Sequence, residues 1–202
     1  MLMNKYLQVS TVMARESGWQ EQRRLVTSED HVLEVGCRGN VAAALMRSAA
    51  HVVDTLDINP ESQPTYLGDV RKWTDLQALK YRYTTIFCCQ VLEHMEQEES
   101  FLAIENMLRL EPTRLVLSLP DNRQSIRFGV LVGAKRLSFI ASRPFSGQSV
   151  SRETSRQHHW EIFGGNLNSL IRKLRSYDNY RLATHYRLFD RPFQHFFILL
   201  KK

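Results

Sequence analysis

Short apolar runs alternate with helical patterns along most of this chain. Five of these runs end at a turn or at a polar residue, as buried strands do; they are residues 31–35, 51–56, 65–67, 83–90 and 114–119. The segments 41–50 and 91–110 are rich in residues that favour helix, such as Ala, Leu, Met and Glu. Because the strands are apolar throughout instead of alternating, we expect a parallel sheet that helices cover on both faces.

The two ends of the chain extend this pattern. Apolar residues at helical spacing predict a leading amphipathic helix over residues 3–26. Residues 180–189 and 193–200 are both strand-like, and the three residues between them are too few for a crossover helix, so they should form an antiparallel hairpin. The predicted fold class is therefore α/β: one domain over residues 1–202, with a doubly wound, mostly parallel seven-stranded sheet and an antiparallel C-terminal hairpin.

The segment 121–156 fits no element of this sheet. It contains seven Lys and Arg residues against two acidic ones, which gives a net charge of +5, and it encloses an apolar stretch between residues 126 and 140. We interpret it as a basic, lid-like insertion that lies over an acceptor or contacts a membrane surface. A packed helical pair with a solvated basic face is the alternative.

Charge is distributed unevenly along the chain. The formal net charge is +6, but residues 1–110 carry 11 basic and 15 acidic side chains (net −4), whereas residues 111–202 carry 16 and 6 (net +10). A basic surface favours anionic partners. Any such partner should therefore contact the second half of the protein.

The cysteines and the hydropathy pattern narrow the class of protein. Cys37, Cys88 and Cys89 are odd in number, and no Cys/His spacing typical of zinc is present, so the sequence predicts neither a disulfide framework nor a metal site. No apolar run approaches the roughly 18 residues of a membrane span. We expect a cytoplasmic protein, with peripheral membrane contact through residues 121–156 left open. The oligomeric state is also left open.

Candidate binding residues follow three of the predicted strands. Gly36 and Gly39 come after the first strand, where a missing side chain lets a ligand approach the backbone. Asp57 lies 21 residues after Gly36, the distance at which an acidic residue accepts hydrogen bonds from ribose hydroxyls. Asp69 ends the third strand, where it can accept from the amine of an adenine. No phosphate-binding P-loop is present, and Arg38 replaces the second glycine of a dinucleotide motif. A ligand with ribose and adenine but without phosphates fits best.

These motifs, in this order, resemble those of class I S-adenosylmethionine-dependent methyltransferases, in particular the small-molecule branch called type 11. The resemblance rests on residues 32–37, 56–61, 68–70, 87–94 and 116–121. It implies a Rossmann-like fold, S-adenosylmethionine as cofactor and methyl transfer as the activity. The cofactor-binding residues that it implies are Glu34, Gly36, Cys37, Gly39, Asp57, Ile58, Asp69, Val70 and Gln90.

Within this set, the resemblance assigns different parts of the cofactor to different residues. Glu34 and Gly36 would shape the methionine end, and Asp57 would hold the ribose hydroxyls. Asp69 and Val70 would hold the adenine, and Gln90 would line the floor near the sulfonium. The chain departs from the family at Arg38 and Asn40, where the motif Gly-x-Gly-x-Gly has glycines. This departure motivates an alternative, a catalytically silent binding protein with the same fold.

The acceptor side is less defined by the sequence. Methyl transfer mainly requires alignment of the reacting groups, and a histidine within hydrogen-bond reach assists when the acceptor is a hydroxyl. His158 and His159 are the catalytic candidates, whereas we interpret His94 as a structural residue at a helix start. We expect a small-molecule acceptor, and the basic insertion favours an anionic or a lipid- or glycan-linked one.

Nucleic acid is the competing acceptor because the chain is basic. The fourth strand ends in Gln90-Val91-Leu92 instead of the Asn/Asp-Pro-Pro-aromatic motif of base-amine methyltransferases, and no recognised nucleic-acid module is present. The sequence therefore argues against nucleic acid, although an RNA-directed methyltransferase stays as an alternative.

Overall fold

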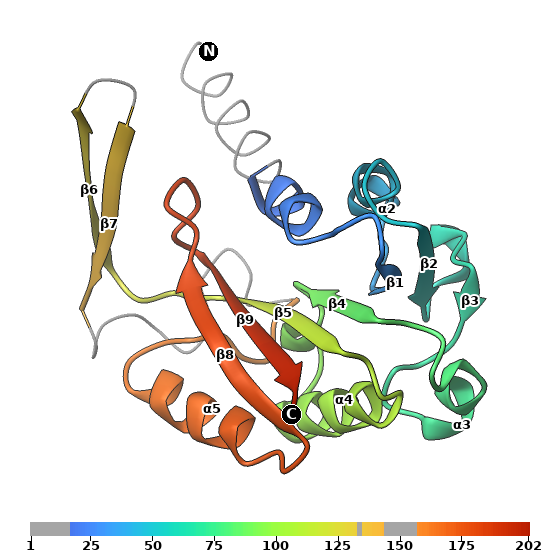
Figure 1. Ribbon diagram of the computed structural model, residues 1–202. Helices are drawn as coiled ribbons and strands as arrows, with labels where there is room; N and C mark the ends of the chain where they lie inside the picture. The colour runs from blue at the N-terminus through green and yellow to red at the C-terminus, as the bar shows by residue number, and fades with distance from the viewer. Residues whose placement is uncertain (1–16, 133–134, 144–156) are drawn as a thin grey trace, which may run out of the picture.

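A computed structural model describes residues 17–132, 135–143 and 157–202 (Figure 1). Its main sheet has seven strands in the order β3-β2-β1-β4-β5-β9-β8. The strands are β1 (His31–Val35), β2 (Val52–Asp57), β3 (Tyr66–Leu67), β4 (Thr85–Cys89), β5 (Arg114–Pro120), β8 (Tyr180–Arg187) and β9 (Gln194–Lys201).

The direction of these strands agrees with the sequence. β1 pairs in parallel with β2 and with β4, β2 pairs in parallel with β3, and β4 pairs in parallel with β5. β9 is antiparallel to both of its neighbours, β5 and β8. The predicted α/β class, with a mostly parallel seven-stranded sheet and an antiparallel C-terminal hairpin, is thus confirmed.

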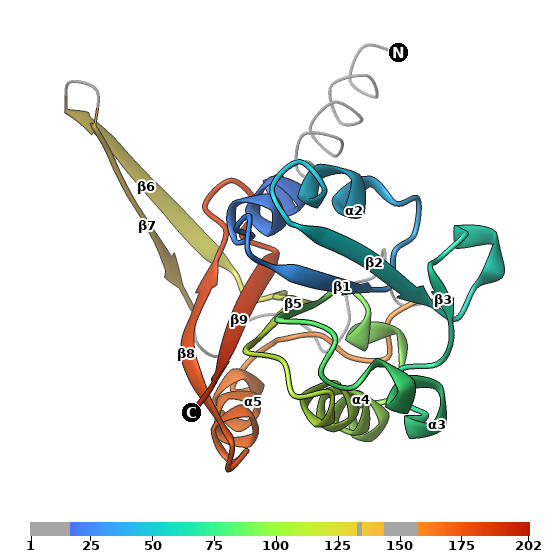
Figure 2. The same ribbon diagram turned by 45° about the vertical axis from the view of Figure 1, so that its right-hand side comes forward.

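Helices cover both faces of the sheet (Figure 2). One face packs against α2 and the helix over residues 17–24, and the other packs against α4 and α5. The helical elements are α2 (Val41–Met46), α3 (Trp73–Leu76), α4 (Gln97–Arg109) and α5 (Asn166–Arg175), with short 3₁₀ turns at Pro60–Ser62, Gln77–Leu79 and Leu92–His94. None of the helices in the described ranges is long and apolar enough to cross a membrane.

Two of the helices differ from their predicted extents. The leading helix predicted for residues 3–26 is helical over 17–24, and its first part lies outside the described residues. The pattern predicted as one helix over 91–110 divides into a 3₁₀ turn and α4, with Met95 extended between them. Glu96 and Glu99 form a reciprocal capping box at the start of α4, and this box satisfies backbone donors that a continuous helix would use internally.

The apolar strands owe their composition to burial on both faces. Val32 and Phe87 point toward α2, whereas their neighbours Leu33 and Ile86 belong to the core on the α4 side, and all four are 0% exposed. Because successive strand residues face opposite ways, a strand buried on both sides must be apolar at every position. Truncation of a side chain such as Phe87 to alanine should cost about 3–5 kcal/mol.

Residues 125–132 and 135–142 of the basic insertion form two paired strands, so the alternative of a packed helical pair is wrong for this part, whereas the segment does lie outside the main sheet as expected. β6 (Ser125–Val132) and β7 (Lys135–Ser142) pair as a separate two-stranded antiparallel sheet that extends away from the main sheet (Figures 1 and 2). Residues 144–156 of the insertion lie outside the described residues. The alternation of apolar and polar residues in Ser125–Val130 has the two-residue period of a strand.

The base of the hairpin is fixed to the main sheet by charged side chains. Asp121, which is fully buried, accepts hydrogen bonds from Arg123 (Nη2–Oδ2, 2.6 Å) and from Nδ1 of His195 on β9 (2.9 Å). Burial raises the pKa of Asp121, but these partners outweigh it and hold the pKa at about 2. Arg187 on β8 donates to Ser142 Oγ at 2.7 Å and so connects β7 to the same cluster.

Candidate functional site

A cavity of about 490 Å³ opens at the carboxyl ends of β1, β2 and β4. The chain runs from β1 outward to β3 on one side and from β4 outward to β5 on the other, so β1 and β4 flank the point where the strand order reverses. Ligands bind at this point in open α/β sheets. The predicted residues that line the cavity are Gly36, Asp57, Ile58, Asp69, Val70 and Gln90.

The turn after β1 requires glycine at Gly36. Its φ is +81°, and a Cβ built there would overlap Cγ2 of Val91. Gly39 also has a positive φ (+75°), but a Cβ added there would have no atom within 4 Å, and Gly39 does not line the cavity. A side chain at Gly36 would therefore displace Val91, which lines the cavity, so this position requires glycine.

The two replaced glycines are compatible with this backbone. Asn40 adopts the left-handed conformation (φ 54°), which Asn tolerates better than most residues, and its side-chain amide donates to the carbonyl of Ser62 at 2.8 Å. Arg38 has no such positive φ; it is exposed and lines the cavity, which places it at the mouth. The backbone of the loop thus keeps a turn without the two glycines.

Glu34 and Cys37 lie buried beside the cavity and are not among the residues that line it. Burial raises the pKa of Glu34 to about 7, against the opposing effect of a hydrogen bond from the Ala43 backbone. Its Oε2 atom has no hydrogen-bond partner within the described ranges. Burial also raises the pKa of the Cys37 thiol, so Cys37 is a small neutral core residue at neutral pH.

Asp57 and Ile58 occupy the edge of the cavity at the end of β2. Oδ1 of Asp57 accepts from the Asn59 backbone N–H at 2.9 Å, which orients the carboxylate. Ile58 is 62% exposed although it is a large apolar residue. An orientated carboxylate beside an exposed apolar side chain suits a ligand with hydroxyl groups and a flat ring.

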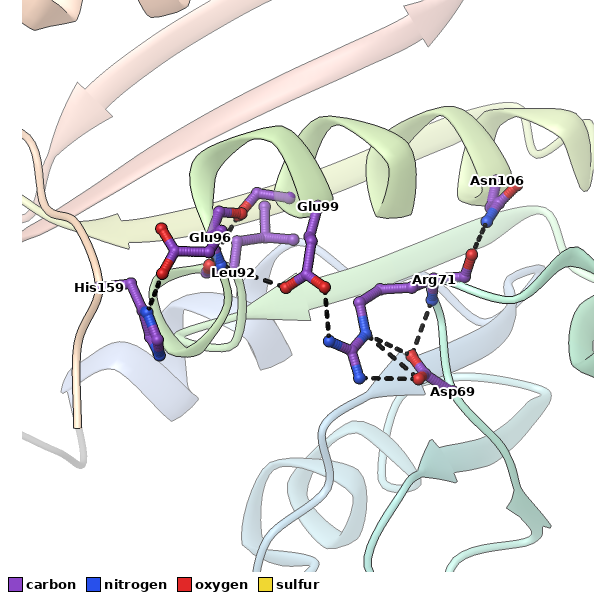
Figure 3. Close-up of polar contacts among 8 residues, drawn as sticks. Asp69, Arg71, Leu92, Glu96, Glu99, Asn106 and His159 are labelled. Atoms are coloured by element: carbon purple, nitrogen blue, oxygen red, sulfur yellow. Dashed lines mark hydrogen bonds and ion pairs between the residues drawn. The ribbon is translucent and has the colours of Figure 1, made fainter.

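Asp69 is bound by a residue that sequence reasoning missed (Figure 3). Arg71 donates to both of its carboxylate oxygens, at 2.9 Å and 2.8 Å, and these hydrogen bonds lower the pKa of Asp69. Nη1 of Arg71 also contacts Glu99 on α4 at 3.1 Å. Arg71 follows Asp69 by only two residues in the sequence. This short separation could have revealed the contact, since a residue two positions later can fold back onto the same carboxylate.

Gln90, the residue that follows β4, has an unusual backbone conformation. Its φ is 59°, which is uncommon for a residue other than Gly, Asn or Asp. Its backbone N–H donates to Ser118 O at 2.9 Å. Strained positions of this kind concentrate at functional sites, and Gln90 is one of the residues that line the cavity.

The histidines are arranged differently from the prediction. His94 lines the cavity, together with Met95 and Gln157, whereas His158 and His159 are not among the lining residues. His94 Nδ1 lies 2.7 Å from the Gln157 carbonyl oxygen, and partial burial of the ring lowers its pKa. No sequence pattern indicated that His94 faces the cavity, because its partner Gln157 is distant along the chain.

His158 and His159 occupy opposite sides of their segment. Nδ1 of His158 lies 2.7 Å from a carboxylate oxygen of Glu161, and only 9% of the His158 side chain is exposed. The side chain of His159 is 48% exposed and contacts Glu96 at 2.7 Å, as Figure 3 shows. His158 is the one that lies against the cavity residue His94, with ring centroids 4.9 Å apart.

Glu93 lies close to His94 and His158. It is 1% exposed, and burial raises the pKa of its carboxyl to about 8. The neighbouring segment is fixed by Trp160, which is buried and donates from Nε1 to the Leu92 carbonyl at 3.1 Å and to Ser100 Oγ at 3.0 Å. Trp160 is therefore a core residue that fixes residues 157–161 beside the 3₁₀ turn Leu92–His94 and the start of α4.

Solved structures with the same architecture include a methyltransferase from Burkholderia thailandensis that methylates 1,6-didemethyltoxoflavin. The TM-score is 0.62 at 13% identity, over all of this chain and 85% of the other. The N-methyltransferase NodS of Bradyrhizobium japonicum gives 0.57 at 13% identity, over 93% and 87%. Both of these structures contain S-adenosylhomocysteine. The fold is that of class I S-adenosylmethionine-dependent methyltransferases.

The methyltransferase fold also occurs within larger proteins. The small RNA methyltransferase HEN1 gives a TM-score of 0.60 at 14% identity, and the match covers 93% of this chain but spans only 24% of that protein. Comparison with protein-family models and with curated protein sequences gave no match. The similarity therefore establishes the fold, and the site itself must support any activity.

Proposed function

We propose that this protein transfers a methyl group from S-adenosylmethionine to a small-molecule acceptor. The observation that carries the proposal is the cavity at the strand-order reversal, which brings Gly36, Asp57, Asp69 and Gln90 together from four separate strand ends. S-adenosylmethionine supplies a methyl group made electrophilic by its bond to a sulfonium.

Two features of the structure fit this cofactor. The turn at Gly36 has room for backbone but not for a side chain, so a ligand can lie directly against it. The buried Oε2 of Glu34 lacks a partner within the described ranges, and an anion near the first turn complements the positive charge of an ammonium or sulfonium group. These observations support binding of the methionine end beside β1.

The remaining roles follow the position of each side chain. We assign the ribose hydroxyls to Asp57, the adenine ring to Ile58 and Val70, and the adenine amine to Asp69. Cys37 and Gly39 would support the loop without lining the cavity. Arg38, at the mouth, is suited to the carboxylate of the methionine group, an anion that a guanidinium binds well.

On the acceptor side, we assign a role to His158 and not to His159. His158 lies against His94 on the cavity wall, while His159 is directed to Glu96 at the protein surface. Methyl transfer needs the acceptor held close to the cofactor, and alignment of this kind can supply about 7–11 kcal/mol of the barrier.

We infer from the β6–β7 hairpin that the protein meets its acceptor at an anionic membrane surface. The register pairs Phe128 with Phe139, and residues 126 and 130 share their face. The exposed fractions of Ile126, Phe128, Val130 and Phe139 are 64%, 47%, 57% and 62%. An apolar face on a segment with a net charge of +5 is typical of contact with anionic lipid. We propose peripheral contact of this kind and a lipid-linked or anionic acceptor.

Calorimetry with S-adenosylmethionine and with S-adenosylhomocysteine tests the central proposal. Asp57→Ala should weaken binding more than tenfold, because charge-assisted hydrogen bonds worth roughly 1.5–3 kcal/mol each are lost. Glu61→Gln is the matched control, since it removes an exposed carboxylate four residues after Asp57 that does not line the cavity. Absence of binding by the wild-type protein at millimolar cofactor would overturn the proposal and favour a silent binding protein.

A further inference from the structure

Glu93, His94 and His158 bring their side chains together at the edge of the cavity. One potential ligand atom from each lies within 4.8 Å of those of the other two. His94 lines the cavity, so the cluster borders the space that we assign to the acceptor. Among the described residues, no other group of His, Cys, Asp and Glu side chains meets this spacing.

Hydrogen bonds fix which nitrogen of each ring is available. The carbonyl oxygen of Gln157 can only accept, so Nδ1 of His94 is the donor at 2.7 Å, and Nε2 keeps its lone pair. Nδ1 of His158 donates in the same way to the carboxylate of Glu161 at 2.7 Å. Metal-binding histidines are held by this arrangement, in which the second ring nitrogen donates to a carbonyl or carboxylate.

A buried carboxyl group at this position lacks hydrogen-bond partners among the described residues. Glu93 is 1% exposed, and neither of its carboxylate oxygens has a hydrogen-bond partner in the described ranges. Glu161, 0% exposed, lies close enough to interact with it electrostatically. Two neighbouring buried carboxylates are costly unless a cation accompanies them. A divalent cation would offset that cost.

We propose that Glu93, His94 and His158 bind a divalent transition-metal ion that holds an oxygen atom of the acceptor. Two imidazoles and one carboxylate form the ligand set of catalytic sites for ions such as Zn²⁺, and they leave further coordination positions open. Bonds of about 2.0–2.2 Å place ligand atoms at most about 4.4 Å apart. Binding therefore draws the three side chains slightly closer, and the exposed His94 has room to move.

The acceptor role of this ion rests on the proposed function, whereas the binding of the ion does not. An ion at the cavity edge would hold an acceptor that carries a hydroxyl or carboxylate oxygen, since hard oxygen ligands occupy open positions on such ions. This narrows the acceptor to oxygen-bearing molecules. The sequence could not suggest it, because His158 follows His94 by 64 residues.

Metal content and calorimetry test the site. Untagged protein is stripped with a chelator, dialysed against Mn²⁺ or Zn²⁺ and analysed by elemental mass spectrometry; we expect one ion per chain. Glu93→Gln and His94→Gln should each weaken the affinity at least tenfold. His159→Gln is the matched control: it is the neighbouring histidine, lies outside the cluster and should bind the ion like wild type.

Several outcomes separate the possibilities. An apoprotein that binds neither ion, or variants that bind like wild type while circular dichroism shows them folded, would overturn the metal site. If Glu93→Gln, a substitution of a buried residue, fails to fold, His94→Gln still tests the metal site, because His94 is exposed. S-adenosylmethionine binding is measured on the same samples. Metal binding without cofactor binding would support the metal site and overturn the proposed function, and the reverse result would do the opposite.

Discussion

Arg71 connects Asp69, which follows β3, to Glu99 on α4. Its guanidinium donates to both oxygens of Asp69, at 2.9 Å and 2.8 Å, and reaches Glu99 at 3.1 Å (Figure 3). The Asp69 side chain is only 8% exposed, whereas Glu99 is 44% exposed. The inner contact is therefore the stronger one, since solvent screens the outer pair. The orientation of the Asp69 carboxylate, which we assign to the adenine amine, depends on this arginine.

Arg71→Gln should weaken S-adenosylmethionine binding several-fold and lower the unfolding free energy by about 1 kcal/mol, because the buried carboxylate loses its charged partner. Calorimetry and urea unfolding measure the two effects. Glu99→Gln breaks only the outer pair and should change stability by less than about 0.5 kcal/mol. Equal effects of the two substitutions would contradict the assignment of Asp69.

The same pair has a defined dependence on pH. Arg71 lowers the pKa of Asp69 in the folded protein, so its stabilisation is complete above the unfolded pKa of about 3.9 and is lost as the pH falls through the lower folded value. The stability difference between wild type and Arg71→Gln should shrink below about pH 4. A difference that stays constant down to pH 2 would show that the pair contributes nothing through charge.

Gly36 and Gly39 offer a matched pair of substitutions. Both have a positive φ, but only at Gly36 does an added Cβ meet another side chain, Val91. Gly39→Ala should cost about 1 kcal/mol from backbone strain alone, whereas Gly36→Ala should cost several kcal/mol and abolish cofactor binding. Thermal unfolding and calorimetry compare the two. Similar losses in both variants would mean that strain, and not the close approach to Val91, limits this turn.

Glu34 should give the protein a stability that decreases with rising pH. Burial raises its folded pKa to about 7, so its carboxyl is protonated in the folded protein at pH 5. Stability falls as the pH rises from the unfolded value of about 4.3 through 7. Glu34→Gln should therefore be about 2–3 kcal/mol more stable than wild type at pH 8 and nearly equal below pH 4, in urea unfolding without cofactor.

The exposed Glu61 serves as a control for this measurement. Glu61→Gln removes an acidic side chain in contact with solvent, so its stability should run parallel to wild type between about pH 4 and pH 8. If Glu34→Gln also runs parallel to wild type, the buried carboxyl is not the group that titrates.

Membrane contact through the β6–β7 hairpin is tested by sedimentation with vesicles. Phe128→Thr combined with Phe139→Thr should reduce pelleting with phosphatidylserine vesicles at least tenfold, because each buried aromatic ring contributes roughly 1.5–3 kcal/mol. Threonine keeps the preference for strand. Tyr81→Thr removes an aromatic residue that is 72% exposed elsewhere and is the control. Equal pelleting of all three proteins would rule out the hairpin as the contact surface.

The local hydrophobic pattern was sufficient to predict the secondary structure of a segment wherever that segment is buried in the same way along its length. The β1 sequence predicts a strand because Val32 and Leu33 face opposite cores and both must be apolar. The C-terminal hairpin was predictable because three residues cannot form a crossover. In the insertion, charged residues around the apolar ones suggested a lid or a packed helical pair, whereas the pairing of Phe128 with Phe139 shows two antiparallel strands.

The sequence by itself determined the α/β fold and the residues at the strand ends, since apolar runs and the turns after them are local properties of the chain. Only the tertiary structure decided which side chains meet. Arg71 returns onto Asp69 after β3, and His158 approaches His94 because the buried Trp160 fixes its segment beside the 3₁₀ turn Leu92–His94 and α4, about 60 residues away in sequence. Contacts of this kind arise from tertiary packing, and no periodicity in the sequence predicts them.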